Sequence, residues 1–170
     1  MTKEITFSPR EIIVSKTDLS GKITYANRVF MRVCNYPESA LLGEPHRVIR
    51  HPDMPRGVFY GMWKTLKAQE EFFGFVKNST YDGNYYWVFA NVTPDYEGQK
   101  PVGYYSVRRV APKEALSDVN ALYQKMRDIE KKCDKASAPK TSWAWLLDYC
   151  EQNKHVSYDA FILNHYQQYR

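Results

Sequence analysis

The chain has 170 residues, of which 44% are hydrophobic, so it can form one domain with a core and an additional segment. Its net charge of +5 is spread without a run of like charges, which disfavours nucleic-acid binding. Cys34, Cys133 and Cys150 lie far apart, which predicts a reduced, cytosolic protein without a zinc site. We find no signal peptide and no apolar run of membrane-spanning length.

The N-terminal part begins with a short arm and a β-hairpin. Residues 11–15 and 22–26 are rich in strand-forming residues and flank the turn Asp18-Leu19-Ser20-Gly21. Asn27 follows the second strand and can cap a helix over residues 28–34, whose apolar side chains fall on one face. We therefore expect two strands followed directly by a short helix.

The next segments complete a sheet. A second short helix is predicted between Pro37 and Gly43, and apolar residues at helical spacing predict an amphipathic helix over residues 57–68. Residues 72–81, 84–95 and 101–110 predict three strands joined by the turns Asp82-Gly83 and Glu97-Gly98. This order predicts an α+β domain with a five-stranded antiparallel sheet and short helices on one face.

The segment Arg50-His51-Pro52-Asp53-Met54-Pro55 separates the predicted helices. Its two prolines exclude a regular helix or a central strand, so we expect a rigid loop. This loop presents the Arg50 cation, the His51 imidazole and the Asp53 carboxylate. Arg50 can bind a phosphate or carboxylate through two hydrogen bonds, or it can pair with Asp53 in a purely structural turn.

The C-terminal segment is predicted to be helical. Apolar residues alternate at spacings of three and four over residues 113–135, as in an amphipathic or coiled-coil helix. Residues 136–140 are predicted to be a linker, Thr141 or Ser142 to cap a second helix, and Ser157 to cap a third. These helices can cover the sheet or provide a partner surface, and we expect them to be the output element.

The element order resembles that of a PAS domain, and several motifs resemble the PAS domain of bacterial aerotaxis transducers more specifically. The similarity covers about residues 14–110 and continues weakly into the next helix. The matching motifs are Asp18-Leu19…Ile23-Thr24-Tyr25-Ala26-Asn27, Gly43-Glu44-Pro45-His46, Arg50-His51-Pro52-Asp53-Met54-Pro55, Met62-Trp63…Leu66-Lys67, Val76-Lys77-Asn78, Tyr86-Trp87-Val88…Ala90-Asn91-Val92-Thr93-Pro94 and Gly103-Tyr104…Ser106-Val107-Arg108.

The resemblance implies a non-covalent FAD whose redox state is reported to a signalling domain. It places six residues at flavin-pocket positions: Asn27, Arg50, His51, Asp53, Trp63 and Asn78. The Trp63 indole could cover the rings of the ligand, and the Asn78 amide offers a donor and an acceptor to a pyrimidine-like edge. Asn91 is a weaker candidate for the same edge.

The chain also differs from related patterns. Photosensory LOV domains carry a reactive cysteine where His46 stands, so a cysteinyl photoadduct is not expected. In aerotaxis-like PAS domains a Trp commonly stands at Phe72, an Arg at Phe89, and basic residues follow Asn78, where this chain has Ser79, Thr80 and Tyr81.

We therefore expect an N-terminal arm (1–13), a PAS sensor domain (14–111) and a helical extension (112–170). The predicted function is a stand-alone cytosolic sensor that binds FAD and signals redox or oxygen state to a partner protein, as a monomer or homodimer. The alternative is a cofactor-free PAS dimerisation or adaptor module. A haem sensor with His46 or His51 as axial ligand is disfavoured by the resemblance, and no nucleophile–base pair indicates an enzyme.

Overall fold

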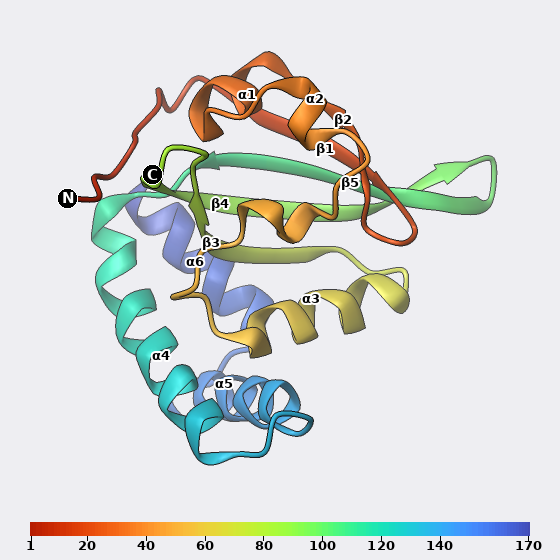
Figure 1. Cartoon of the computed structure of the whole chain (residues 1–170). Coiled ribbons are helices and arrows are strands. Elements are labelled where there is room, and N and C mark those ends of the chain that lie inside the picture. Colours follow the sequence, from red (N-terminus) through yellow and green to blue (C-terminus); the bar gives the residue numbers. More distant parts are fainter.

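The computed structural model describes residues 1–170, which form one antiparallel sheet covered by helices on both faces. The strands are listed here in chain order: β1 (Ile13–Asp18), β2 (Ile23–Ala26), β3 (Phe72–Ser79), β4 (Tyr85–Glu97) and β5 (Lys100–Val110). Their order across the sheet is β2-β1-β5-β4-β3, so the two ends of the domain sequence meet in the middle of the sheet (Figure 1). The predicted α+β class and the five strands are confirmed.

Short helices cover one face of the sheet, which we call the inner face. They are α1 (Arg28–Cys34), α2 (Glu38–Leu41), the 3₁₀ helix η1 (His46–Ile49) and α3 (Arg56–Lys67). Asn27 caps α1 as predicted, because its Oδ1 accepts a hydrogen bond from the Phe30 amide at 3.0 Å. The sequence pattern did not indicate η1, which leads directly into the proline-bounded loop.

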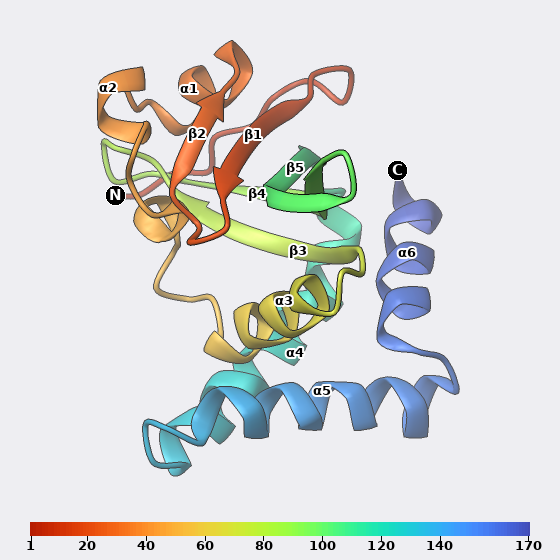
Figure 2. The same cartoon turned by 90° about the vertical axis from the view of Figure 1, so that its right-hand side faces the viewer.

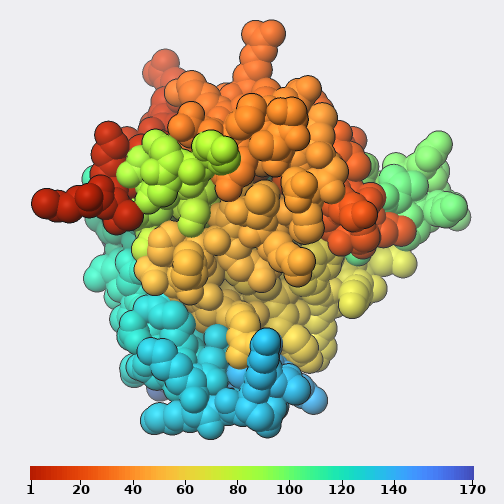
Figure 3. Space-filling view, in the orientation of Figure 1, coloured from red at the N-terminus to blue at the C-terminus, as the bar shows by residue number.

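Three further helices cover the opposite, outer face and one edge of the sheet. These are α4 (Lys113–Lys132), α5 (Ala138–Lys154) and α6 (Tyr158–Tyr169). Figures 1 and 2 show α4 and α6 beside the sheet and α5 running along α3, so the tail wraps around the β3 edge. In the space-filling view α3 and the segment before it are exposed, with α5 directly below (Figure 3). The prediction of helices on one face of the sheet therefore applies to residues 14–111 but not to the whole chain, because the tail covers the other face.

Alternating residues divide the sheet into two cores. Inner-face side chains such as Ile13, Tyr86 and Val88 pack with Phe30 of α1. On the outer face, the Trp87 ring stacks on Tyr123 of α4, whose hydroxyl donates to the Phe75 carbonyl at 2.5 Å. Such a sheet buries apolar side chains from both faces, which explains the long β4 strand with few exposed residues.

The tail corrects two details of the sequence interpretation. The expected linker over 136–140 is wrong, because α5 already begins at Ala138 and holds Pro139 in its first turn, where a missing N–H is tolerated. Thr141 and Ser142 therefore lie inside the helix and do not cap it. The predicted Ser157 cap is confirmed by a hydrogen bond from the Ala160 amide at 3.2 Å. None of the helices combines the length and apolarity that a membrane span needs.

Candidate functional site

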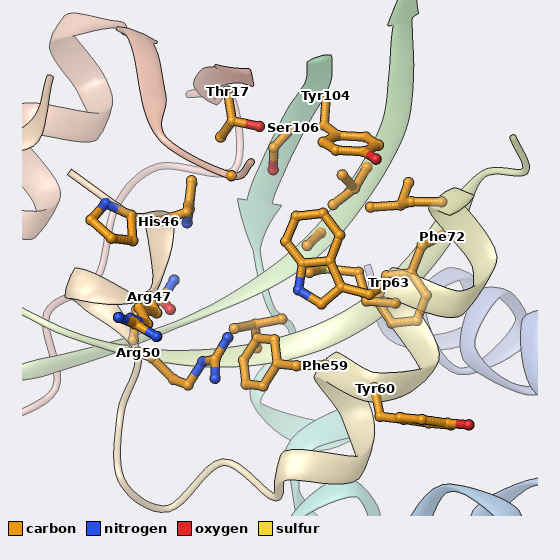
Figure 4. A pocket seen from close by; sticks show the side chains of 18 of the residues that line it. Thr17, His46, Arg47, Arg50, Phe59, Tyr60, Trp63, Phe72, Tyr104 and Ser106 are labelled. Carbon is orange, nitrogen blue, oxygen red and sulfur yellow. The ribbon is translucent and has the colours of Figure 1, made fainter. Parts of the chain in front are cut away.

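A cavity of about 670 Å³ lies between the inner face of the sheet, α3 and η1. This volume falls within the roughly 300–1,000 Å³ typical of small-molecule sites. Strands β1, β3, β4 and β5 supply one wall, and the β1–β2 turn, η1 and α3 supply the other (Figure 4). The cavity therefore lies on the face that the short helices cover.

Aromatic side chains form much of the α3 side of the cavity. Phe59 and Trp63 are four residues apart, so they project from the same face of α3. The Trp63 ring meets Tyr104 of β5 edge-to-face, with centroids 5.2 Å apart, and stands at the centre of Figure 4. Gly21 lies against this indole with φ of +88°, a conformation that strongly favours glycine. The β1–β2 turn can therefore approach Trp63 closely.

Arg50 lies beside the aromatic wall and does not pair with Asp53. Its guanidinium covers the Phe59 ring at 3.6 Å from the centroid, and its buried Nε has no hydrogen-bond partner (Figure 4). Burial lowers the pKa of Arg50 to about 10, which leaves the side chain charged at neutral pH. The structural alternative of an Arg50–Asp53 pair is wrong, because the Asp53 carboxylate accepts from Lys77 Nζ at 2.8 Å.

A second buried cation, Arg108, lies on the inner face of β5 and is 2% exposed. It donates to Ser15 Oγ at 2.6 Å, and its other terminal nitrogen lies 3.2 Å from His46 Nε2. Burial and the adjacent Arg108 charge lower the pKa of His46 to about 3, so the imidazole is neutral and its Nε2 can accept this hydrogen bond. The guanidinium also covers Phe30 at 4.4 Å, yet its buried Nε has no partner and no carboxylate contacts it.

The charge of the cavity wall is uniform in sign. Five cationic side chains line it and no Asp or Glu does; they are Lys22, Arg47, Arg50, Arg56 and Arg108. Cations focused in a cavity of low dielectric attract negatively charged groups. The wall therefore suits a ligand that combines flat, apolar rings with anionic groups.

Three of the seven predicted site residues line this cavity: Arg50, Trp63 and Asn78. The backbones of Arg50 and Asn78 form an isolated antiparallel bridge, which brings the loop against β3. Asn78 is only 4% exposed, and β3 directs it to the inner face together with Val76. The structure thus brings together one cation, one indole and one amide from separate elements.

The other four predicted residues do not line the cavity. The Asn27 amide caps α1 and ties it to β1 by accepting from Val14 N at 3.1 Å. His51 and Asp53 interact with each other and with Lys77 beside the loop. Asn91 lies on the outer face, where its Nδ2 donates to Glu71 at 2.8 Å. His51 directly follows the lining residue Arg50, and Asn91 lies between the lining residues Ala90 and Val92 but faces the other side of the sheet.

The sequence interpretation missed Arg108 and the role of His46. An arginine within a strand is typical of a solvent-facing position, and its partners Ser15 and His46 are distant in sequence. The available signal was its alternation with Tyr104 and Ser106, which also line the cavity.

Two residues that differ from the family pattern lie on different sides of the sheet. Phe72 lines the cavity, whereas Phe89 lies on the outer face and stacks on Tyr166 of α6 with centroids 4.0 Å apart. Cys34, Cys133 and Cys150 are free, and none of them lines the cavity. A bound ligand would therefore have no cysteine in the cavity wall.

This sheet order, with a helix-covered cavity of mixed polarity on the inner face, defines an α+β sensor module. The chain belongs to the PAS family: the family described as PAS fold matches residues 23–108. It is 44% identical over 112 residues to the aerotaxis receptor of Escherichia coli K12, a match that covers 66% of this chain and 22% of the receptor. The predicted resemblance to an aerotaxis-receptor PAS domain is confirmed.

A further relative is the nitrogen fixation regulatory protein of Klebsiella pneumoniae, 30% identical over 117 residues, with 69% of this chain and 23% of the relative covered. The chain thus spans less than a quarter of the length of these relatives. Among solved structures, the blue-light photoreceptor aureochrome 1 LOV domain superposes with a TM-score of 0.56 at 18% identity, covering 72% of this chain and 94% of that one. A structure used for a flavin-analogue study of the light-oxygen-voltage domain mechanism gives 0.55 at 20% identity, covering 69% and 85%. These two likenesses show the fold.

Proposed function

We propose that this PAS sensor binds FAD non-covalently in the cavity and signals its redox state to a partner protein. The observation that carries the proposal is a cavity wall that holds aromatic side chains, one buried amide and five cations, with no Asp or Glu among its lining residues. FAD combines a flat ring system with a negatively charged pyrophosphate, and this composition matches the wall. Relatives support the same reading, because one is an aerotaxis receptor and a fold neighbour was studied with a flavin analogue.

Each cavity residue has a distinct role in this proposal. Trp63 would cover the face of the flavin rings, and the Asn78 amide would bond the pyrimidine edge as both donor and acceptor. Arg50 and Arg108, whose buried Nε atoms have no protein partner, would bond anionic or carbonyl oxygens. Asn27, His51 and Asp53 would position the loop and α1, and Asn91 would stabilise β4 from the outer face.

A bound FAD would supply reversible electron transfer, and its change of charge would act on the surrounding cations. The chain's own contribution is to bind and orient the rings, to exclude water and to transmit the change through the elements that line the cavity. The partner is a signalling protein, and the chain acts as a sensor module and not as an enzyme.

Flavin binding can be tested with purified protein. We expect a yellow protein that releases FAD on denaturation, and an apoprotein whose melting temperature rises with FAD more than with riboflavin, because riboflavin has no phosphate for the cations. At a hundredfold excess over Kd, a ligand adds about 2.7 kcal/mol to the free energy of unfolding.

Two variants and a control sharpen this test. Trp63→Ala and Arg50→Ala should retain the fold by circular dichroism and lose most of the FAD-induced shift. Trp145→Ala, which removes an indole of α5 that stacks on Tyr149 outside the cavity, should keep the shift. A wild-type protein that responds to none of FAD, FMN and riboflavin would favour the cofactor-free adaptor, and a Soret band would favour the haem alternative.

A further inference from the structure

Helix α3 has two functional faces. One face carries Phe59 and Trp63 into the cavity, and the other places Gly57 and Gly61 against α5. A Cβ atom on Gly61 would clash with the indole of Trp143, and one on Gly57 would clash with the Ser142 hydroxyl. We call the contact between these four residues the α5 seat, and it brings the two helices closer than side chains on α3 would allow.

The N-terminus of α3 is also tied to the tail. The amides of Arg56 and Gly57 donate to the Glu130 carboxylate of α4 at 3.1 and 2.8 Å, which satisfies two of the free N–H groups of the first turn. The same carboxylate accepts from Ser142 Oγ at 2.7 Å. Since the Glu130 side chain is only 10% exposed, this junction joins α3, α4 and α5 away from bulk water.

A second set of contacts joins the tail to the strand side of the cavity. Tyr158 of α6 stacks on Phe72, which lines the cavity, and meets Trp143 edge-to-face with centroids 4.8 Å apart. Its hydroxyl donates to the Phe73 carbonyl at 2.8 Å. Pro139 of α5 itself lines the cavity. The tail therefore touches the cavity wall at α3, at β3 and directly.

We propose that α5 and α6 complete the ligand site, with Trp143 as the positioning residue that holds α3 so that Phe59 and Trp63 face the ligand. The inference rests on the proposed binding of FAD. If the docked tail raises the affinity for FAD by some factor, FAD stabilises tail docking by the same factor, because coupling between two equilibria is reciprocal. The tail is then a part of the sensor that reads the state of the cavity.

The variant Gly61→Ala tests the α5 seat. Alanine is a better helix former than glycine by about 1 kcal/mol, so any loosening of α5 comes from the clash with Trp143 and not from a weaker α3. We expect faster proteolysis within residues 133–157 and an FAD Kd, measured by quenching of flavin fluorescence, at least about fivefold higher than wild type. Trp143→Ala should act in the same direction.

Two further variants control for nonspecific effects. Trp145→Ala removes an indole from the same helix without touching Gly61, and its Kd should stay within about twofold of wild type. The double variant with Gly61→Ala and Trp143→Ala no longer contains the clash, so it should bind FAD no worse than Trp143→Ala alone. If the losses of FAD affinity in the two single variants added up in the double variant, the proposed role of the α5 seat would be contradicted.

A measurement on the wild-type protein does not depend on how variants fold. FAD should slow amide hydrogen exchange in α5. The slowing factor should be similar to the factor by which undocking of the tail lowers the affinity for FAD. Unchanged exchange in α5, or protease-sensitive variants that bind FAD within about twofold of wild type, would overturn this inference and leave flavin binding intact. A wild-type protein that binds no flavin would overturn the proposed function and the inference with it.

Discussion

Arg108 shows how single residues set the character of the cavity. Moving a charge out of water costs several kcal/mol unless partners compensate it. Here a neutral imidazole, a hydroxyl and an aromatic face surround the guanidinium, and its Nε has no partner. This incomplete compensation within the protein is consistent with a ligand that supplies the missing acceptor.

We predict opposite effects of Arg108→Met on the apoprotein and on ligand binding. The apoprotein should lose little stability, because an incompletely paired buried charge is removed together with its desolvation cost. The FAD affinity should fall about tenfold or more, since a charged hydrogen bond contributes about 1.5–3 kcal/mol and each 1.4 kcal/mol is tenfold. Thermal shift measurements on the apoprotein and on titration with FAD report these two effects. Arg109→Met, one residue along and exposed, is the control, and equal FAD shifts in the two variants would contradict the role of Arg108.

The neutral His46 predicts a pH dependence of stability. Its pKa is about 3 in the folded protein and about 6.5 when unfolded, so below pH 6.5 the unfolded chain binds a proton that the folded protein does not. The neutral His46 therefore costs no stability above pH 6.5. As the pH falls from 6.5 towards 3, the free energy of unfolding decreases by up to about 1.4 kcal/mol per pH unit. Urea unfolding at pH 7, 6 and 5 should show a steeper loss for wild type than for His46→Gln.

A control separates this effect from general acid destabilisation. His155 is exposed at the end of α5, so His155→Asn should follow the wild-type slope. If His46→Gln and wild type lose stability in parallel, a charged imidazole is tolerated at this site.

At the scale of elements, α4 explains how the tail is held on the outer face. Its buried residues recur at spacings of three and four and include Leu116, Val119 and Tyr123. This pattern is an apolar stripe along one side of the helix, and the sheet supplies the complementary surface. Of the two packing partners expected for this helix, the sheet of the same chain is the one that the structure contains.

We predict that Val119→Asp detaches α4 from the sheet. Val119 is 1% exposed, so the new carboxylate would be buried without a partner and should cost roughly 3–5 kcal/mol, as uncompensated buried charges do. Protease sensitivity after residue 112 should rise, and size-exclusion chromatography should report any change of assembly. Ser117→Asp adds the same charge at an exposed position and should change neither readout. Unchanged behaviour of Val119→Asp would indicate that α4 is a passive linker.

At the scale of the whole molecule, the tail covers the outer face of the sheet at β3 and β4. Phe89 stands where the aerotaxis-like pattern commonly has an arginine, and here its ring packs against Phe73, Phe75 and Tyr166. An apolar residue at this position fits a strand that is covered by α6. The presence of Phe89 in place of arginine is therefore explained by the packing of the tail and not by the charge of the cavity.

This location predicts that Phe89→Arg has opposite effects in two forms of the chain. In the full chain it should lower stability by about 3–5 kcal/mol, the range for losing a large buried aromatic side chain. In a form ending at Ala111, the outer face is exposed and should promote association, and the added charge should reduce it. Urea unfolding and light scattering measure the two effects. Equal aggregation of the shortened forms with Phe89 and with Arg at this position would contradict the assignment.

Features with local signals could be predicted from the sequence alone. Asn27 and Ser157 cap their helices as predicted because a capping side chain acts on amides two or three residues away. The family resemblance implied pocket positions for Trp63 and Asn78, and both side chains line the cavity. The family resemblance could be read from motifs that lie along the chain in order.

Contacts between residues that are distant in sequence could not be predicted in this way. Arg108 bonds Ser15 across 93 residues, Glu130 caps a helix that begins at Arg56, and Trp143 lies against Gly61. Local propensity carries no information about such partners, because their free energy depends on burial and on the exact approach of two elements. For the same reason α5 could begin at Ala138 within a predicted linker: its packing on α3 and the junction at Glu130 stabilise a first turn that the local sequence did not indicate.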